Sequence, residues 1–380
     1  MGFAAILLGW LILLLAIGAI GYTVQATLAV RRFARAPFPS RTAPEPVTLL
    51  KPLLGLEPGL RGNLATFLNQ DWPAPTQIVA GANRADDPAL AVARDLSPDV
   101  VVTACPEPAT GNPKIANLVS MMPAAEHEII ILSDSDMAAP PDYISRVVAA
   151  LEQPTVGAAT CVYRGRGDAG GWSRFAAAAI SYQFAPSVVT SYALGAEQAC
   201  MGSTIALRRA TLQGIGGFEA FADSLADDHA IGMAIRRLGL KVVPVPRMVL
   251  VHVCTEPTLT EVWRHEVRWA ATVRGVNFSG HVGSLLTHPL ALSLLAVPFM
   301  PAAGATVVAA ALLVRCLLAR TVDHWAGERT APIWWLPARD LLSFAVFIAS
   351  FTTRSVDWRG ARLRIGPRGR LSAEPEIRVP

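Results

Sequence analysis

The stretch IILSDSDMAAPPD, residues 130–142, ends an apolar run at two aspartates one residue apart, Asp134 and Asp136. Two carboxylates placed together after a buried strand repel each other and lose hydration, and a bound divalent cation removes both costs. No histidine or cysteine stands beside them in the sequence, so the pattern favours Mg²⁺ or Mn²⁺ over zinc. The alternative is a solvated turn in which Asp134 caps backbone amides.

Short apolar runs alternate with helical patterns around this stretch. The alternation is typical of an α/β domain with a doubly wound, mostly parallel sheet. Such sheets bind ligands beyond the carboxyl ends of their strands, where Asp134 and Asp136 would lie. The predicted strands are 47–51, 77–80, 99–103 and 128–132, and the helical patterns lie around 60–69, 88–96 and 114–123.

The composition narrows the class of protein. Of the 380 residues, 52% are hydrophobic and only 16% are charged, which is low for a soluble protein. Five scattered cysteines without a CxxC pair indicate neither a disulfide framework nor a zinc site. The net charge of +4 is mild, and seven arginines gather in residues 353–380 instead of forming a stripe. We therefore expect no nucleic-acid partner.

Residues 3–30 carry no charge and would form a helix of about 42 Å, longer than the ~30 Å hydrocarbon core requires. A signal peptide would need a basic start and an apolar stretch of about 7–15 residues, so we expect a transmembrane anchor over 1–32. The arginines that follow the apolar stretch are Arg31, Arg32, Arg35 and Arg41. By the positive-inside rule they place the next segment in the cytoplasm.

A second apolar block lies near the end of the chain. Its parts 285–314 and 333–352 have room for two or three spans, and Pro298 and Pro301 make the first part either a hairpin or one kinked span. Three spans would place the arginine-rich tail outside, against the charge rule, whereas two spans, or two plus a re-entrant piece, would keep it inside. The predicted parts are an anchor (1–32), a cytoplasmic catalytic domain (45–280), a transmembrane region (284–352) and a tail (353–380).

Two motifs in the first half of the chain pair a helix start with a charged residue. ADDPAL, residues 85–90, places Asp87 directly before a proline, which is a good helix cap and leaves the carboxylate near a possible ligand. GNPKIANL, residues 111–118, places Lys114 near another helix start, where a cation and free amides suit a phosphate. Read alone, Lys114 is also explained as a solvated lysine.

LADDHAIGMAIRRLG, residues 225–239, reads as an amphipathic helix that begins at Asp227 and Asp228. One aspartate is enough to cap the helix. The other is a candidate general base at the lip of the domain.

EVWRHEVRWAATVRG, residues 261–275, reads as a second helix and carries His265, Arg268 and Trp269. These three are candidate site residues. The alternative is a basic amphipathic helix that lies on the membrane surface.

The residues singled out above occur in the order Asp87, Asp134, Asp136, Asp228, His265, Arg268 and Trp269. This order resembles the ceramide glucosyltransferase family of inverting glycosyltransferases, which have the GT-A nucleotide-sugar-binding fold. The resemblance runs from about residue 47 to 364 and includes an N-terminal anchor and a hydrophobic C-terminal region. The motifs that carry it are LKPLLGLEPGL (50–60), NQDWP (69–73), DDPA (86–89), NPKIANL (112–118) and WRGARLR (358–364).

Two positions depart from the family pattern. His265 stands where the family usually has Gln or Arg, so the charge there depends on pH. Asp136 is a second acid that eukaryotic members lack. Both features resemble the bacterial branch, closest to the hopanoid-biosynthesis glycosyltransferases that act on bacteriohopanetetrol, which implies the bacterial inner membrane and UDP-N-acetylglucosamine.

The resemblance also implies a mechanism, a single in-line displacement at the anomeric carbon of a UDP-sugar. It makes Asp228 the general base that takes the proton of the acceptor hydroxyl. Asp134 and Asp136 would hold Mg²⁺ or Mn²⁺ against the β-phosphate of UDP. The other implied donor contacts are Asp87 and Lys114 at the nucleotide and His265, Arg268 and Trp269 at the diphosphate.

The implied acceptor is a lipid whose hydroxyl lies at the bilayer surface. A hopanoid with UDP-N-acetylglucosamine and ceramide with UDP-glucose are both open, because no residue here selects the sugar. A polysaccharide synthase-like transferase and a non-catalytic membrane scaffold are further alternatives. The apolar stretch 175–195 is either an interfacial helix that guides the lipid or a core helix.

Overall fold

The structure is a computed structural model that describes residues 3–38, 44–105, 111–196, 199–353, 355–358, 361–365 and 371–373. Arg41 and part of the arginine-rich tail lie outside the described residues. The chain forms two compact units. The sheet unit is Ala34–Asp168 with Leu194–Thr255, and the helical unit is Met1–Phe33, Ala169–Ala193 and Glu256–Pro380. The predicted catalytic range 45–280 is thus shared between the two units.

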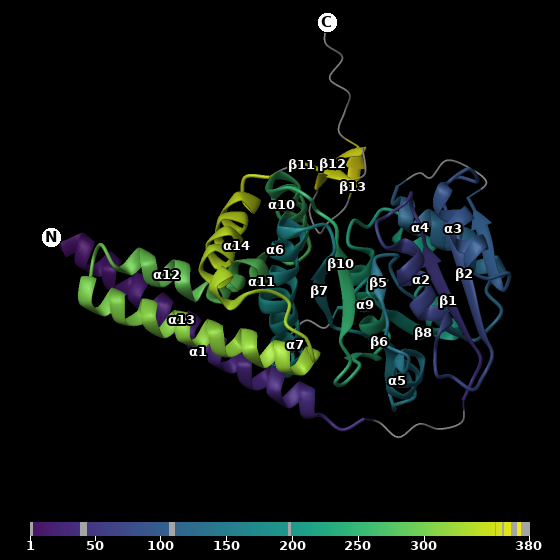
Figure 1. Ribbon diagram of the computed structural model, residues 1–380, viewed down its shortest axis with the longest axis horizontal. Helices are drawn as coiled ribbons and strands as arrows, with labels where there is room; N and C mark the ends of the chain where they lie inside the picture. Colours follow the sequence, from purple (N-terminus) through teal and green to yellow (C-terminus); the bar gives the residue numbers. More distant parts are fainter. Residues whose placement is uncertain are drawn as a thin grey trace, which may run out of the picture. The chain divides into compact units, whose positions relative to one another are not determined.

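The strands of the main sheet are β1 (Val47–Pro52), β2 (Thr76–Ala82), β3 (Val100–Ala104), β4 (Ile129–Leu132), β6 (Val156–Thr160), β8 (Ile205–Arg208) and β9 (Lys241–Pro244). Their order in the sheet is β3-β2-β1-β4-β8-β6-β9 (Figure 1). Neighbours pair in parallel except at β8, which runs antiparallel to β4 and β6. The predicted α/β fold with a mostly parallel sheet is confirmed.

Helices on both faces of this sheet explain why its strands are apolar throughout. Successive residues of a strand point to opposite faces, so Leu49 packs in one core with Leu64, and Leu50 packs in the other with Leu118. The helices of the sheet unit are α2 (Leu60–Leu68), α3 (Pro88–Leu96), α4 (Pro113–Met121), α5 (Tyr143–Leu151), α8 (Arg209–Gly214) and α9 (Asp227–Arg237).

A second, smaller sheet joins parts of the sheet unit that are far apart in sequence. It consists of β5 (Met137–Ala138), β10 (Leu250–Cys254) and β7 (Tyr163–Gly167), with β10 in the middle. β5 follows Asp136 directly, and its Met137 pairs with His252 of β10. The pairing therefore brings a histidine to the aspartates that follow β4.

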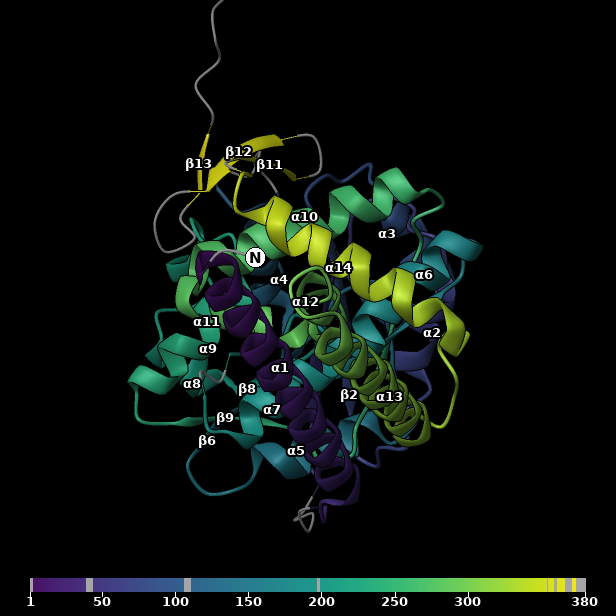
Figure 2. The same cartoon turned by 90° about the vertical axis from the view of Figure 1, so that its left-hand side faces the viewer.

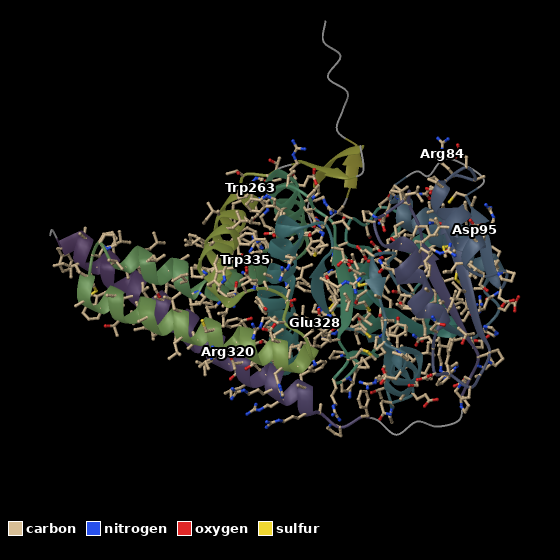
Figure 3. The ribbon with its side chains drawn as sticks, viewed as in Figure 1. Arg84, Asp95, Trp263, Arg320, Glu328 and Trp335 are labelled. Carbon is tan, nitrogen blue, oxygen red and sulfur yellow. The ribbon has the colours of Figure 1, made fainter. Side chains whose placement is uncertain are left out.

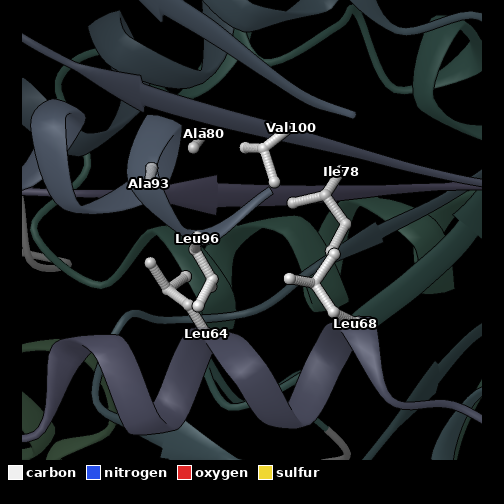
Figure 4. A pocket seen from close by; sticks show the side chains of 7 residues that line it. All are labelled: Leu64, Leu68, Ile78, Ala80, Ala93, Leu96 and Val100. Atoms are coloured by element: carbon white, nitrogen blue, oxygen red, sulfur yellow. The ribbon is translucent and has the colours of Figure 1, made fainter. Parts of the chain in front are cut away.

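A small pocket between α2, α3 and the main sheet is entirely apolar (Figure 4). It is lined by Leu64, Leu68, Ile78, Ala80, Ala93, Leu96 and Val100. Because no polar group lines this pocket, it belongs to the hydrophobic core and has nothing with which to orient a polar substrate.

The helices of the helical unit are α1 (Phe3–Arg35), α6 (Gly171–Ala179), η2 (Ile180–Phe184), α7 (Ala185–Ala193), α10 (Leu259–Val276), α11 (Phe278–Gly283), η4 (Ser284–Thr287), α12 (Pro289–Ala296), α13 (Pro301–Ala326), η5 (Ile333–Trp335) and α14 (Leu336–Ser350). Within the described residues, three segments are long and apolar enough to cross a membrane: Phe3–Arg35, Pro301–Ala326 and Ile333–Ser350. The expected N-terminal and C-terminal apolar helices are therefore present.

The structure decides between alternatives that the sequence leaves open. Residues 285–314 form a hairpin, because the Ser293 hydroxyl donates to the Val307 carbonyl at 3.3 Å and a Cβ at Gly304 would lie 2.7 Å from the Cα of Val297. Stretch 175–195 is mostly core, with Tyr182 only 2% exposed. In the tail, β11 (Ser355–Trp358), β12 (Ala361–Ile365) and β13 (Leu371–Ala373) pair antiparallel, and residues 359–360 of the WRGARLR motif lie outside the described residues.

Candidate active site

A buried lysine supports the loop after β4 through hydrogen bonds. Nζ of Lys51, at the end of β1, donates to the carbonyl oxygen of Asp134 at 2.6 Å and to Oγ of Ser133 at 3.2 Å. Burial lowers the pKa of Lys51 to about 7, although nearby carboxylates act in the opposite direction. The LKPL motif thus supplies a support for the aspartate loop that the sequence analysis did not identify.

Asp136 lies between the loop and β10. Its carbonyl oxygen accepts the backbone N–H of Val253 at 2.9 Å, and Oδ2 lies 3.5 Å from Nδ1 of His252. Its other oxygen, Oδ1, is buried and has no hydrogen-bond partner among the described residues. Burial of an unsatisfied carboxylate oxygen is costly, so Asp136 and His252 together suit a cation. No group of three or more His, Cys, Asp or Glu in the described part of the chain could hold a metal ion.

Lys114 is engaged by two carboxylates. The side chain of Asn112 caps α4, and Nζ of Lys114, in the first turn, lies 2.7 Å from Oδ1 of Asp134 and 3.3 Å from Oδ2 of Asp227. Burial alone would lower the pKa of this lysine, but Asp134, Asp227 and Asp228 outweigh it and raise the pKa. The interpretations of Lys114 as a solvated lysine and of Asp134 as a solvated cap are therefore wrong.

Gly202 joins Asp134 to Asp228. Its carbonyl accepts the backbone N–H of Asp134 at 3.1 Å, and its own N–H donates to Oδ2 of Asp228 at 3.1 Å. A Cβ at this position would lie 2.4 Å from Oδ2 of Asp134, so only glycine permits the approach. Gly232 on α9 packs equally closely on the backbone of Cys200, which brings the 200–202 segment to the start of the helix.

Asp227 and Asp228 lie inside the first turn of α9. Ala226 is the N-cap residue and makes no side-chain bond, so the expectation that one aspartate caps the helix is wrong. Oδ1 of Asp228 instead accepts the N–H of His229 at 2.7 Å, inside the turn where the helix dipole favours a negative charge. Burial and, secondly, the charge of Asp227 raise the pKa of Asp228 to about 6, despite the opposing effect of Lys114.

Asp87 has the structural role that its sequence predicts. It caps α3 by accepting the N–H of Ala89 at 2.9 Å, and it also accepts the N–H of Gly55 at 3.0 Å. Asp87 thereby ties the loop after β1 to the loop after β2. Its neighbour Asp86 pairs with Arg84, whose side chain points outward (Figure 3).

His265, Arg268 and Trp269 belong to the helical unit, on α10, and share one face because they are three and four residues apart. Nδ1 of His265 contacts Oε1 of the mostly buried Glu256, and the rings of His265 and Trp269 pack edge to face at 4.5 Å. Nε2 of His265 is buried and has no hydrogen-bond partner within the described residues. The sheet unit brings Asp134, Asp136, Lys114 and Asp228 together without these three residues.

α10 packs against α14 within the helical unit (Figure 2). Its Glu266 forms a two-bond ion pair with Arg339 of α14, at 2.9 and 2.6 Å, and its Val262 is fully buried. This packing does not test the alternative of a basic helix lying on the membrane surface, which stays a prediction.

Sequence reasoning missed His252, Gly202, Lys51 and Glu256. His252, Gly202 and Lys51 reach the predicted residues through contacts between distant segments, and only Lys51 lies in a motif that the sequence analysis quotes. A buried strand, LVHVC, with one histidine was the available signal for His252.

Comparison with known proteins identifies the family of this chain and proteins with a similar fold. The profile of glycosyl transferase family 21 matches residues 10–371. The structure of the mannosyltransferase PcManGT from Pyrobaculum calidifontis, in complex with GDP-Man and Mn²⁺, is similar with a TM-score of 0.55 and 21% identity, over 90% of this chain and 98% of that chain. Glucosyl-3-phosphoglycerate synthase from Mycobacterium tuberculosis, in complex with phosphoglyceric acid, gives a TM-score of 0.40 and 16% identity, over 60% and 79%. The predicted GT-A-like fold is confirmed.

Proposed function

Since this chain belongs to glycosyl transferase family 21, and is therefore an enzyme, we propose that it moves a hexose from a UDP-sugar to a hydroxyl group of a membrane lipid, with inversion. The main support is the cluster of Asp134, Lys114 and Asp228 around Gly202, at the carboxyl ends of β1 and β4. Ligands of open α/β sheets bind at this edge. The cluster provides, within one unit, a candidate general base and charged side chains that can bind the donor.

Asp228 is the general base of the proposed reaction. Two backbone N–H groups, of Gly202 and His229, fix its carboxylate, and its pKa of about 6 leaves it ionised at neutral pH. A raised pKa also makes it a stronger proton acceptor than an ordinary aspartate. Asp228 takes the proton of the acceptor hydroxyl while that oxygen attacks the anomeric carbon.

Asp136 and His252 are the proposed holders of a divalent cation, and Asp134, which contacts Lys114, belongs to the same loop. The unsatisfied Oδ1 of Asp136 and the imidazole 3.5 Å from Oδ2 support this choice, and the similar mannosyltransferase is described with Mn²⁺. When bound, Mg²⁺ or Mn²⁺ would neutralise charge on the leaving diphosphate. Replacing His252 by asparagine should weaken Mn²⁺ binding to the donor-free protein by about 10–100-fold, measured by electron paramagnetic resonance. An unchanged affinity in that variant would remove His252 from the site.

The remaining proposed residues contact the nucleotide-sugar donor. We assign Asp87 and Lys114 to the nucleotide side, and Arg268 and Trp269 to the diphosphate. Glu256 accepts a hydrogen bond from Nδ1 of His265, so the buried Nε2 donates to a phosphate oxygen only in the imidazolium form, when both ring nitrogens carry a proton. Arginine at position 268 supplies a charge at every physiological pH.

The proposed acceptor is bacteriohopanetetrol and the proposed donor is UDP-N-acetylglucosamine. The support is the resemblance of His265 and Asp136 to the bacterial branch, together with three helices apolar enough for a membrane. The basic end of α1 favours a sheet unit on the cytoplasmic side of a bacterial inner membrane, where UDP-sugars are found.

The test supplies detergent-purified enzyme with bacteriohopanetetrol or ceramide, each with UDP-glucose or UDP-N-acetylglucosamine, and identifies products by mass spectrometry. Transfer should be greatest for the hopanoid with UDP-N-acetylglucosamine and should disappear with Asp228→Asn. The matched control is Asp86→Asn, an exposed aspartate of the same unit, which should behave as wild type. Glucosylation of ceramide alone would overturn the acceptor and sugar but keep the assigned base.

A further inference from the structure

The two aspartates after β4 occupy the first and third positions of a turn. The backbone N–H of Met137 closes this turn by donating to the carbonyl oxygen of Asp134 at 3.4 Å. The side chains of Asp134 and Asp136 are 32% and 36% exposed, whereas Ser135 between them is 6% exposed. The aspartate turn, residues 134–137, therefore leaves both carboxylates partly open and buries Ser135.

Distant segments hold the backbone of the aspartate turn. The carbonyl oxygen of Asp134 accepts from Nζ of Lys51, and that of Asp136 accepts from the backbone of β10. The carbonyl oxygen of Ser135 accepts from Nδ2 of Asn63, on α2, at 3.3 Å. A turn has no regular ladder to pair its polar groups, so its shape depends on partners of this kind.

The Ser135 side chain joins the aspartate turn to the segment between β1 and α2. Its Oγ donates to Oε2 of Glu57 at 2.5 Å, which is a charge-assisted hydrogen bond. Two residues before Glu57, the N–H of Gly55 donates to both carboxylate oxygens of Asp87, each at 3.0 Å. Residues 53–59 thus bind Asp87 on one side and the aspartate turn on the other.

The backbone of residues 53–59 is itself constrained. Gly55 and Gly59 have φ of +62° and +78°, a region that favours glycine, and they allow the segment to bend at both positions. Between them the N–H of Glu57 donates to the carbonyl of Gly55 at 3.2 Å, and its carbonyl accepts the N–H of Leu60 at 3.1 Å. The backbone on both sides of Glu57 is therefore fixed, and its carboxylate is directed at Ser135.

From this geometry we propose that Glu57 is a positioning residue that holds the aspartate turn and fixes its distance from Asp87. Asp87 and the turn are the proposed sites of the nucleotide and the cation, so the inference rests on the proposed function. One donor must reach both sites, so their separation has to match its length. A displacement of about 1 Å in such a site costs about 10²-fold in rate.

Two substitutions of Glu57 separate its hydrogen bond from its charge. Glu57→Gln removes the charge and keeps an oxygen that accepts from Ser135, whereas Glu57→Ala removes both. Ser135→Ala removes the same hydrogen bond from its other end. The matched control is Glu126→Ala, at an exposed glutamate of the same unit. All variants are made in the full-length chain and purified in detergent.

Amide hydrogen exchange of residues 133–138, measured without metal or donor, tests the turn itself. Glu57→Ala and Ser135→Ala should each exchange about tenfold faster than wild type, because each loses a hydrogen bond to a charged group. The double variant should be no faster than the singles, since both remove one bond. Unchanged exchange in Glu57→Ala and Ser135→Ala, or an additive double variant, would overturn the proposal. Should Glu57→Ala fail to fold, Ser135→Ala gives the same comparison.

Mn²⁺ alone is the probe for the positioning role. Its affinity for the donor-free protein, measured by electron paramagnetic resonance, should fall about tenfold in Glu57→Ala and stay within about threefold in Glu57→Gln. Equal losses in these two variants would mean that the charge of Glu57 attracts the cation directly, and would overturn the positioning role. A wild-type protein that binds no Mn²⁺ would overturn the cation assignment instead, and hydrogen exchange would still decide whether Glu57 holds the turn.

Discussion

The two units handle buried charge differently. In the helical unit, Arg315 binds Asp340 through two hydrogen bonds of 2.8 and 2.7 Å, and Arg339 binds Glu266 in the same way. Each of these buried carboxylates has a guanidinium of its own. In the sheet unit a single lysine, Lys114, serves both Asp134 and Asp227. Asp228 accepts from two backbone N–H groups, and Oδ1 of Asp136 has no hydrogen-bond partner among the described residues.

This difference separates charges that hold the fold from charges available to a ligand. Removing one member of a matched pair leaves a buried charge, which costs stability, whereas the pair itself performs no chemistry. Burial and, secondly, the charge of Asp227 raise the pKa of Asp228, and Oδ1 of Asp136 has no hydrogen-bond partner among the described residues. Perturbed groups of this kind are typical of reaction centres.

The largest expected effect is that of Asp228→Asn on turnover. Loss of the general base should lower kcat by about 10²–10⁴-fold while the KM for the UDP-sugar stays almost unchanged. The thermal midpoint should stay close to wild type, because the substitution removes a charge that burial disfavours. Near-normal kcat at neutral pH would show that Asp228 only supports the first turn of α9.

Breaking the Arg315–Asp340 ion pair should lower stability, whereas Asp228→Asn should lower turnover. Arg315→Met leaves Asp340 buried without its partner and should destabilise the helical unit by about 3–5 kcal/mol. Adding Asp340→Leu should recover most of the loss, because two apolar side chains then replace two charges. Thermal unfolding in detergent measures both variants. A single variant as stable as wild type would remove the distinction between the units.

Gly202→Ala sharpens the comparison inside the sheet unit. The added methyl would lie 2.4 Å from Oδ2 of Asp134, so the aspartate must move, and displacement of about 1 Å in a reaction centre costs about 10²-fold in rate. Gly195→Ala, at an open position with positive φ, is the control for generic glycine loss. Equal behaviour of the two variants in a kcat assay would argue against a role for the Gly202 contact.

The smallest effect is on the pH profile. Asp228 must be ionised to accept a proton, and its pKa of about 6 lies above that of an ordinary aspartate. kcat/KM should therefore be flat above this value and fall about tenfold per pH unit below it. A profile that stays flat down to pH 4.5 would mean that the base is another group or that its pKa is not raised.

Local patterns were enough to predict much of the sheet unit. The first four strands and three helices lie within two residues of their predicted bounds, because each combines an apolar run with a clear stop or a proline-assisted cap such as Asn112-Pro113. Asp134, Asp136 and Asp228 were predicted as site residues for the same reason, since each follows a strand or begins a helix.

What the sequence did not predict depends on pairing between distant segments. His252 reaches Asp136 only because β10 pairs with β5, and Gly202 reaches Asp134 only because the chain returns after β7. Lys51 looks like an ordinary strand residue until the fold places Asp134 above it. The sequence pattern alone does not show that these residues lie close together.

The packing of α1 against later segments of the helical unit sets the order of assembly. Ala16 and Ala19 of α1 are fully buried, in a cluster whose later members begin near residue 285. At about 5–20 residues per second, a ribosome needs roughly 15–60 s to reach those partners after making α1. During that interval the small-residue face of α1 can contact only lipid or other membrane proteins. The helical unit, built from three separated stretches of chain, therefore closes last.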